Sequence, residues 1–312
     1  MALELYPNSG YHVSMNAATE LLFPLPACEP RISGQLLKWI GNKQRFAHEV
    51  LSYFPARFGT YFEPFIGSGA VLGTLAPEKA QAGDAFRPLI EIWSTLKENP
   101  ELVSHWYAER HALIARMGKV SAYAHVLASY NRSANGADLL FLSRTCYGGV
   151  VRFRKSDGCM STPCGPHNPI LPEKFTRRAY EWHRRIAGTT FTHCDYRELL
   201  EQAQSGDVVY CDPPYFDSQS ILYGAQTFRL NDLYESIAQC KERGVFVALS
   251  IDGIKKSGKN IVSIEPPVGL FEEEILIQCG RSMLKRFQMG GQTLESEVVA
   301  DRLFLTHSRS AS

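Results

Sequence analysis

Apolar positions along this chain repeat with two periods, that of a helix and that of a strand. Phe46, Val50, Leu51 and Phe54 follow helical spacing until Pro55 ends the pattern, which predicts a helix. The same patterns predict strands over 60–65, 80–84, 189–193, 208–210, 245–250 and 298–306, and helices from 70 onward and over 88–97, 173–186, 197–203 and 230–243. Strands that alternate with helices indicate an α/β fold built from βαβ units.

Three stretches depart from this alternation. Residues 1–30 contain several Pro, Gly and Asn residues and no sustained periodicity, so we expect an irregular N-terminal extension. Residues 99–142 have a mainly helical pattern, and residues 144–169 are rich in Gly, Pro, Ser and Arg. We therefore predict an α/β domain formed by 31–98 and 188–312, interrupted by an insertion at 99–187.

Composition narrows the class of protein. Hydrophobic residues make up 45% of the 312 residues and charged residues 21%, which excludes a disordered or collagenous chain. No apolar run approaches the roughly 18 residues that suggest a membrane span, and no Lys or Arg precedes Arg31, so we expect neither a membrane segment nor a secretory signal. The eight cysteines form no C-x-x-C pair, which favours reduced thiols in the cytoplasm over disulfides or a zinc site.

The net charge of +1 conceals an uneven distribution. Residues 144–197 hold ten basic and four acidic residues, whereas residues 198–312 hold eleven basic and sixteen acidic ones. The basic block indicates a face that binds a polyanion. A solvated, arginine-rich surface would give the same count, so charge alone leaves both interpretations open.

A glycine turn follows the first predicted strand. Gly67 and Gly69 allow a ligand to approach the backbone closely, although such turns are also common as purely structural devices. Leu72 stands where a dinucleotide-binding G-x-G-x-x-G motif would have its third glycine, which disfavours a dehydrogenase. Asp84, at the end of the next predicted strand, is placed to bind the hydroxyls of a ribose. The pattern suits a cofactor that carries a nucleoside.

The strand predicted over 208–210 runs into Asp212-Pro213-Pro214-Tyr215. Two consecutive prolines cannot extend a sheet, so the chain projects Asp212 and Tyr215 beyond the end of the strand. Open α/β sheets bind their ligands at this edge. A plain turn with a capping aromatic residue is the structural alternative.

Four segments together have the order seen in one enzyme family: Leu37–Lys43 (LKWIGNK), Phe62–Val71 (FEPFIGSGAV), Asp195-Tyr196 and Asp212–Tyr215. A fifth, Phe141–Arg152 followed by Ser161–Gly165, is similar to that family's DNA-reading hairpin. Over about residues 35–307 the chain resembles the Dam-like D12 class of adenine-N6 DNA methyltransferases, which use S-adenosylmethionine. The resemblance implies a Rossmann-like methyltransferase sheet, and a mainly helical DNA-recognition insertion that carries a β-hairpin.

The resemblance also implies a set of cofactor-binding residues: Trp39, Lys43, Glu63, Phe65, Gly67, Gly69, Asp84, Asp195 and Asp212. Trp39 and Lys43 would hold the methionine end of the cofactor, with Lys43 as a partner for its carboxylate. Asp84 would bind the ribose hydroxyls, and Asp195 would lie near the adenine. The ordinary alternatives are a core position for Trp39 and a solvated side chain for Lys43.

This chemistry explains the D-P-P-Y segment. The exocyclic amine of adenine is a poor nucleophile because its lone pair is delocalised into the ring. Asp212 and the carbonyl of Pro213 can accept the two N6 hydrogens, so that the lone pair points at the methyl carbon, and Asp212 can take up the released proton. Tyr215 would stack on an adenine flipped out of the duplex. We predict Asp212, Pro213, Pro214 and Tyr215 as catalytic residues, with in-line transfer, no covalent enzyme intermediate and no metal.

The basic block overlaps the segment similar to the DNA-reading hairpin. The predicted contacts with phosphates or base edges are Arg144, Tyr147, Arg152, Arg154, Lys155 and Pro163. Gly148 stands where the family usually has Asn, and Met160-Ser161-Thr162 replaces the usual Phe-Asn-Val. These departures put the family's commonest target, GATC, in doubt and leave a different adenine-containing site at least as well supported. The partners that this role implies are double-stranded DNA and a cognate restriction endonuclease.

Two other functions fit parts of the sequence. One is methylation of an amine in RNA or in a free nucleobase, and duplex-dependent binding that falls steeply with salt would distinguish DNA from these acceptors. The other is a DNA-binding relative that has lost catalysis. The intact Asp212, Tyr215 and glycine turn argue against the second.

Overall fold

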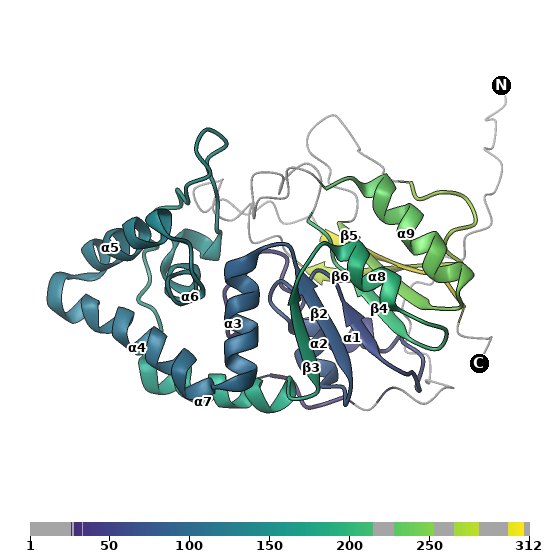
Figure 1. Ribbon diagram of the computed structural model, residues 1–312, viewed down its shortest axis with the longest axis horizontal. Helices are drawn as coiled ribbons and strands as arrows, with labels where there is room; N and C mark the ends of the chain where they lie inside the picture. The colour runs from purple at the N-terminus through teal and green to yellow at the C-terminus, as the bar shows by residue number, and fades with distance from the viewer. Residues whose placement is uncertain are drawn as a thin grey trace, which may run out of the picture.

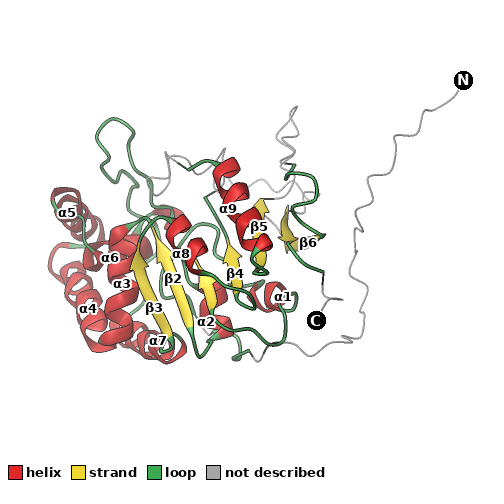
Figure 2. Ribbon diagram, turned by 45° about the vertical axis from the view of Figure 1, so that its right-hand side comes forward, coloured by secondary structure: helices red, strands yellow, loops and turns green. Residues whose placement is uncertain are grey.

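A mixed β-sheet forms the centre of the computed structural model, which describes residues 26, 28–32, 34–214, 228–252, 265–280 and 299–308 (Figures 1 and 2). Within these residues the strands lie in the order β3-β2-β1-β4-β5-β7-β6. Their bounds are β1 (Tyr61–Glu63), β2 (Ala80–Asp84), β3 (Thr189–His193), β4 (Val208–Cys211), β5 (Phe246–Asp252), β6 (Glu273–Gly280) and β7 (Val299–Leu305). The first five strands pair in parallel, and β7 lies antiparallel between β5 and β6.

Helices cover both faces of this sheet. Their bounds are α1 (Ala47–Leu51), α2 (Ala70–Leu75), α3 (Arg87–Glu98), α4 (Pro100–Met117), α5 (Lys119–Arg132), α6 (Gly136–Thr145), α7 (Pro172–Arg185), α8 (Tyr196–Gln202) and α9 (Leu230–Glu242). Helices α8 and α9 pack on one face, whereas α1, α2 and α3 pack on the other. Helices α4 to α7 extend the molecule beyond β3 (Figure 1). Among the described helices, none has the length and apolar character needed to cross a membrane.

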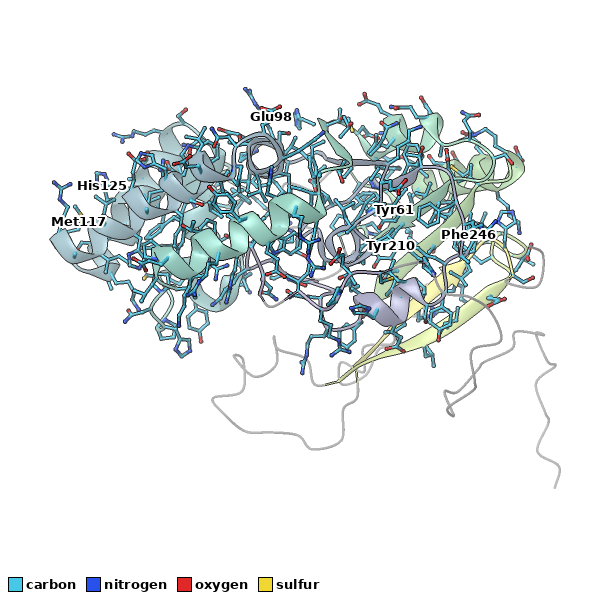
Figure 3. The ribbon with its side chains drawn as sticks, turned by 90° about the horizontal axis from the view of Figure 1, so that it is seen from below. Tyr61, Glu98, Met117, His125, Tyr210 and Phe246 are labelled. Atoms are coloured by element: carbon cyan, nitrogen blue, oxygen red, sulfur yellow. The ribbon has the colours of Figure 1, made fainter. Side chains whose placement is uncertain are left out.

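Successive residues of the central strands enter opposite halves of the core. Tyr210 packs on the α1 side and Val209 on the α9 side, as expected for parallel strands that are buried on both faces. Figure 3 shows Tyr61, Tyr210 and Phe246 close together on neighbouring strands. The ring of Phe54, just after α1, lies 6.2 Å from each of these three rings. The run of aromatic and aliphatic residues in these strands is therefore used on both sides of the sheet.

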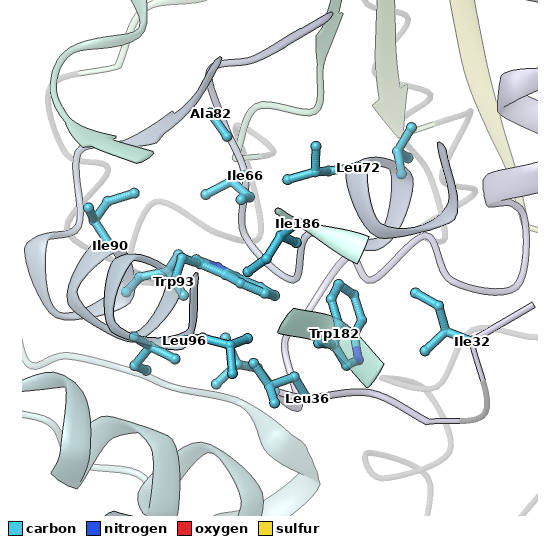
Figure 4. Packing of buried hydrophobic residues seen from close by; sticks show 14 of the residues in the cluster. Ile32, Leu36, Ile66, Leu72, Ala82, Ile90, Trp93, Leu96, Trp182 and Ile186 are labelled. Atoms are coloured by element: carbon cyan, nitrogen blue, oxygen red, sulfur yellow. The ribbon is translucent and has the colours of Figure 1, made fainter. Parts of the chain in front are cut away.

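Two indole rings join the glycine turn to the helices beside it. The rings of Trp93 in α3 and Trp182 in α7 lie 5.3 Å apart, deep in the core (Figure 4). A Cβ atom at Gly69 would lie 3.0 Å from the Trp93 ring, and one at Gly73 would lie 2.5 Å from the Trp182 ring. Trp93 Nε1 also donates a hydrogen bond to the carbonyl of Gly67 at 3.1 Å. Glycine at 69 and 73 is therefore required by packing, whatever the cavity binds.

The core of the sheet continues into the insertion. Tyr107 of α4 stacks on Phe175 of α7 with ring centroids 4.2 Å apart, and both belong to the same buried cluster as Trp93.

An antiparallel hairpin, defined here as residues 145–165, follows α6. Its two arms pair through their backbones at Cys146 with Cys164 and at Phe153 with Met160. In Figure 2 the arrowheads of β2, β3 and β4 point toward the end of the molecule from which this hairpin projects. One buried cluster contains residues from both sides of the predicted limits of the insertion, 99 and 187, so the packing is continuous across these limits.

Most predicted elements are confirmed by the structure. Strands β2 and β3 have the predicted bounds, and the predicted helices match α3, α7, α8 and α9 to within one or two residues. Strand β6 was missed, because Leu276 is an exposed apolar residue on its outer side and obscures the alternation with buried Ile275 and Ile277. Most of the predicted N-terminal extension lies outside the described residues.

Candidate active site

A cavity of about 310 Å³ opens at the carboxyl edge of the parallel strands. Because these strands run in one direction, the residues that follow them meet at one edge of the sheet. The predicted site residues that line the cavity are Trp39, Lys43, Glu63, Phe65, Gly67, Asp84, Asp195, Asp212, Pro213 and Pro214. Gly69 is not one of the described residues that line it, and Tyr215 lies outside the described residues.

The glycine turn and Asp84 form one wall of the cavity. Gly67 has a φ of +46°, and a Cβ atom there would lie 3.2 Å from the ring of Trp39. The Asp84 carboxylate accepts hydrogen bonds from the backbone N–H groups of Phe86 at 3.0 Å and Gly67 at 3.4 Å. Burial raises the pKa of Asp84 to about 6, although these two hydrogen bonds act in the opposite direction. Asp84 is thus held rigidly beside the turn, where it was predicted to bind a ribose.

Glu63 has a structural contact that the sequence did not reveal. Its Oε2 atom accepts hydrogen bonds from the Tyr61 hydroxyl at 2.7 Å and from the backbone N–H of Leu72 at 2.9 Å. Leu72 lies in the first turn of α2, so this carboxyl group satisfies one of the amides that a helix leaves without an intrahelical partner. Burial raises the pKa of Glu63 to about 8. Glu63 therefore stabilises the helix start in addition to lining the cavity.

The structure revises the predicted role of Lys43. The side chain is buried, and Nζ lies 2.8 Å from Oδ1 of Asp212 and 3.4 Å from Oδ2 of Asp301. Burial lowers the pKa of Lys43, but the two carboxylates outweigh it and raise the pKa above its ordinary value. Lys43 is thus not solvated, and its contact with a cofactor carboxylate stays a prediction. Its charge already balances two carboxylates of the protein.

Three aromatic rings lie at the opposite end of the cavity. Phe65 stacks on Tyr196 with centroids 5.1 Å apart, and Phe228 meets the Phe65 ring edge-on at 5.8 Å. Asp195 caps α8, where its Oδ1 accepts from the backbone N–H of Arg197 and its side chain forms an ion pair with that arginine at 2.8 Å. The side-chain hydrogen bond from Arg197 lowers the pKa of Asp195.

Several residues that line the cavity or lie beside Lys43 were not predicted. Tyr196 is part of the Asp195-Tyr196 segment but had no predicted role of its own, and Phe228 belongs to no motif. Asp301 lies on β7, far along the chain from the D-P-P-Y segment. The only available signal was for Tyr196, because an aromatic residue beside a predicted adenine-binding acid suits a stacking role.

The hairpin presents some of its predicted DNA contacts to solvent, but not all of them. Arg152, Arg154, Lys155 and Pro163 are exposed, and Tyr147 is 40% exposed. Arg154 forms an ion pair with Asp157 at 2.6 Å across the tip.

The prediction for Arg144 is wrong, because this arginine is buried and cannot reach DNA in this structure. Its guanidinium donates to the carbonyls of Gln35 and Leu36 at 2.8 and 2.7 Å, and it lies over the Phe175 ring. Burial lowers the pKa of Arg144. Arg144 therefore anchors the segment that leads to Trp39 and Lys43.

Comparison with known proteins gives one family and several relatives. The model of the D12 class N6 adenine-specific DNA methyltransferases matches residues 39–264. The chain is 28% identical over 228 residues to the type II methyltransferase M1.LlaDCHI of Lactococcus lactis subsp. cremoris, covering 68% of this chain and 79% of the relative. It is 32% identical over 206 residues to the retron Ec67 DNA adenine methylase of Escherichia coli, covering 64% and 69%. A DNA adenine methylase of Vibrio cholerae is 28% identical, covering 69% and 79%.

Proposed function

Because the chain belongs to the D12 class of N6 adenine-specific DNA methyltransferases, we propose that it methylates adenine at a specific site in duplex DNA with S-adenosylmethionine as methyl donor. One observation carries this proposal. A single cavity joins the glycine turn, the predicted ribose-binding residue Asp84 and the aromatic cluster to Asp212. A cofactor with a nucleoside at one end, an amino acid at the other and a reactive sulfonium methyl group between them fits this arrangement.

The residues present suit each part of that cofactor. The rings of Phe65, Tyr196 and Phe228 offer apolar surface for the adenine, and Asp195 lies beside them. The carboxylate of Asp84 would accept hydrogen bonds from the ribose hydroxyls.

The turn at Gly67 has the open backbone that a close ligand needs, with Trp39 packed against it. Trp39 would also contact the methionine end. S-adenosylmethionine supplies an electrophilic methyl group, which is bonded to a sulfonium sulfur. Once the methyl group is transferred, the rest of the cofactor is a neutral thioether and a good leaving group.

The protein's own part in the reaction is to prepare the adenine amine. Lys43 holds Oδ1 of Asp212, so the other carboxylate oxygen would accept one N6 hydrogen while the Pro213 carbonyl accepts the second. These two bonds would favour a pyramidal nitrogen, whose lone pair is less delocalised into the ring and can point at the methyl carbon. Asp212 would take up the proton that the amine loses after transfer. Tyr215 stays a predicted stacking partner for the flipped base.

We also propose that residues 99–187 recognise the target sequence. The hairpin carries exposed Arg152, Arg154 and Lys155 and projects from the end of the molecule at which the cavity opens (Figures 1 and 2). A groove-reading hairpin beside a base-binding cavity suits an enzyme that must contact the duplex and extrude one base. One relative is named a type II methyltransferase, which supports pairing with a restriction endonuclease of the same specificity.

The test is incubation of the purified protein with labelled S-adenosylmethionine and a mixed-sequence duplex, followed by nucleoside analysis and sequencing of modified sites. We expect N6-methyladenine in one short sequence context. Label in RNA or a free nucleobase, with none in duplex DNA, would overturn the proposal. Binding of S-adenosylmethionine without transfer to any acceptor would indicate a relative that has lost catalysis.

Asp212→Asn sharpens this test. The variant keeps the shape of the side chain but removes the proton acceptor, so we expect kcat to fall at least about 100-fold. Binding of S-adenosylmethionine, measured by calorimetry, should change by less than about threefold, because other residues hold the cofactor. Glu235→Gln on the exposed side of α9 is the control and should behave as wild type. Equal loss of binding and transfer in Asp212→Asn would make this acid structural.

A further inference from the structure

Lys43 joins two carboxylates that lie far apart in the chain, Asp212 and Asp301. Its Nζ atom donates a hydrogen bond to Oδ1 of Asp212 at 2.8 Å and contacts Oδ2 of Asp301 at 3.4 Å. The carbonyl of Gly41 accepts a further hydrogen bond from Nζ at 3.3 Å. Lys43 and Asp301 are 5% and 8% exposed, so water screens this ion pair weakly. Asp301 is thus part of the environment of the predicted catalytic acid.

The sheet topology explains how Asp301 reaches this position. Strand β7 runs antiparallel to β5, so its amino end lies at the edge where the parallel strands have their carboxyl ends. Asp301 is near the start of β7 and pairs with Asp252, the last residue of β5. Asp212 directly follows β4, on the other side of β5. Lys43, from the loop before α1, bridges the two carboxylates across this edge.

We propose that Asp301 is a positioning residue for methyl transfer, which holds Lys43 in place and thereby orients the Asp212 carboxylate toward the adenine amine. This inference rests on the proposed function. The contact of Lys43 with Oδ1 fixes the Asp212 carboxylate in one orientation at the edge of the cavity. Asp301 also shares the charge of Lys43, so Asp212 keeps more of its negative charge and remains a stronger proton acceptor.

Removal of the Asp301 charge should therefore weaken Asp212 as an acceptor. In Asp301→Asn, Lys43 has one carboxylate less to balance, and Asp212 becomes less basic. The ionisable groups around Lys43 and Asp212 are Glu63, Tyr210, Cys211 and Asp301. Among the described residues, Lys43 forms ion pairs with Asp212 and Asp301.

The experiment compares Asp301→Asn with Glu274→Gln, a matched control. Glu274 is also a carboxylate on the outer strands of the sheet, but its ion pair, at 2.6 Å, is with Arg302 and not with Lys43. For Asp301→Asn we expect kcat to fall about tenfold, with KM for duplex DNA and for S-adenosylmethionine changed by less than about threefold. In the pH profile of kcat, the acid limb, where kcat falls because Asp212 is protonated, should move to lower pH by about one unit. Glu274→Gln should leave kcat and the pH profile unchanged.

A conservative variant separates charge from packing. Asp301→Glu keeps the carboxylate, so its acid limb should stay at the wild-type pH and its kcat should exceed that of Asp301→Asn. If Asp301→Asn folds poorly, the position of the acid limb in Asp301→Glu still tests the proposal. An unmoved acid limb in Asp301→Asn, or equal kcat losses in the two variants, would overturn it. Wild-type enzyme without any transfer to duplex DNA would instead contradict the proposed function.

Discussion

The cavity and the hairpin both concentrate charge, but they treat it in opposite ways. At the cavity, Lys43 and Asp301 are buried and form an ion pair with each other, and Lys43 is also bound to Asp212. On the hairpin, Arg152 and Lys155 are exposed, and Arg154 pairs only with Asp157 next to it among the described residues. A buried charge needs a permanent partner in the protein. An exposed charge is stabilised by water until a ligand displaces that water.

The difference shows how this enzyme divides its work. In the proposed mechanism, the charges that act on the adenine amine must be in place before the base arrives, because reorganisation during the reaction would add to the barrier. Charges that meet phosphates can remain hydrated and mobile, since their partner is the DNA itself. The comparison predicts that changes at the cavity alter stability and catalysis together, and that changes on the hairpin alter DNA affinity alone.

The largest expected effect is the pH dependence of stability caused by Glu63. Because burial raises its pKa to about 8, the folded protein keeps a proton that the unfolded chain has lost above about pH 4.5. The contribution is complete below that pH and disappears as the pH rises toward 8. Between pH 6 and 8 the free energy of unfolding should fall by about 2 kcal/mol more in wild type than in Glu63→Gln. Urea titrations without cofactor at several pH values measure the free energy of unfolding of both proteins. If this free energy changes with pH in the same way in both, Glu63 is ionised in the folded protein and the prediction is wrong.

Arg144→Met tests the boundary between the two regions, because this arginine belongs to the basic block by sequence and to the core by structure. Its loss leaves the carbonyls of Gln35 and Leu36 without their donor, which should cost about 1–2 kcal/mol of unfolding free energy. Urea unfolding measures this cost. The salt dependence of DNA binding should stay as in wild type, and a slope reduced by about one would restore Arg144 as a phosphate contact.

The smallest effect is expected at the hairpin tip. Asp157→Asn removes the partner of Arg154 and a negative charge, so affinity for duplex DNA should rise a few-fold with a steeper salt dependence. The thermal midpoint should not change, because exposed pairs contribute little to stability. Arg152→Ala on the same hairpin is a control that removes a positive charge, so it should lower the affinity for duplex DNA. Binding titrations at several salt concentrations would refute the comparison if Asp157→Asn bound DNA more weakly.

The sequence was sufficient for the architecture because each core strand carries its own local signal. Strands 80–84 and 189–193 are bounded by residues that end strands, and the predicted bounds are those observed. The D-P-P-Y segment placed Asp212 at a strand end for the same local reason. Strand β6 escaped prediction because its pattern depends on which side of an edge strand faces solvent, and that is settled by its neighbours.

The amino-acid sequence by itself determined the α/β order, the family, the glycine turn and the acid that follows β4, since all of these depend on residues close together in the chain. Only the tertiary structure decided which charges are buried and which partners they have. It moved Arg144 from the DNA surface to the core, turned Glu63 into a cap for α2, and brought Asp301 to Lys43. Burial and pairing are set by residues distant in sequence, so local patterns carry no signal for them.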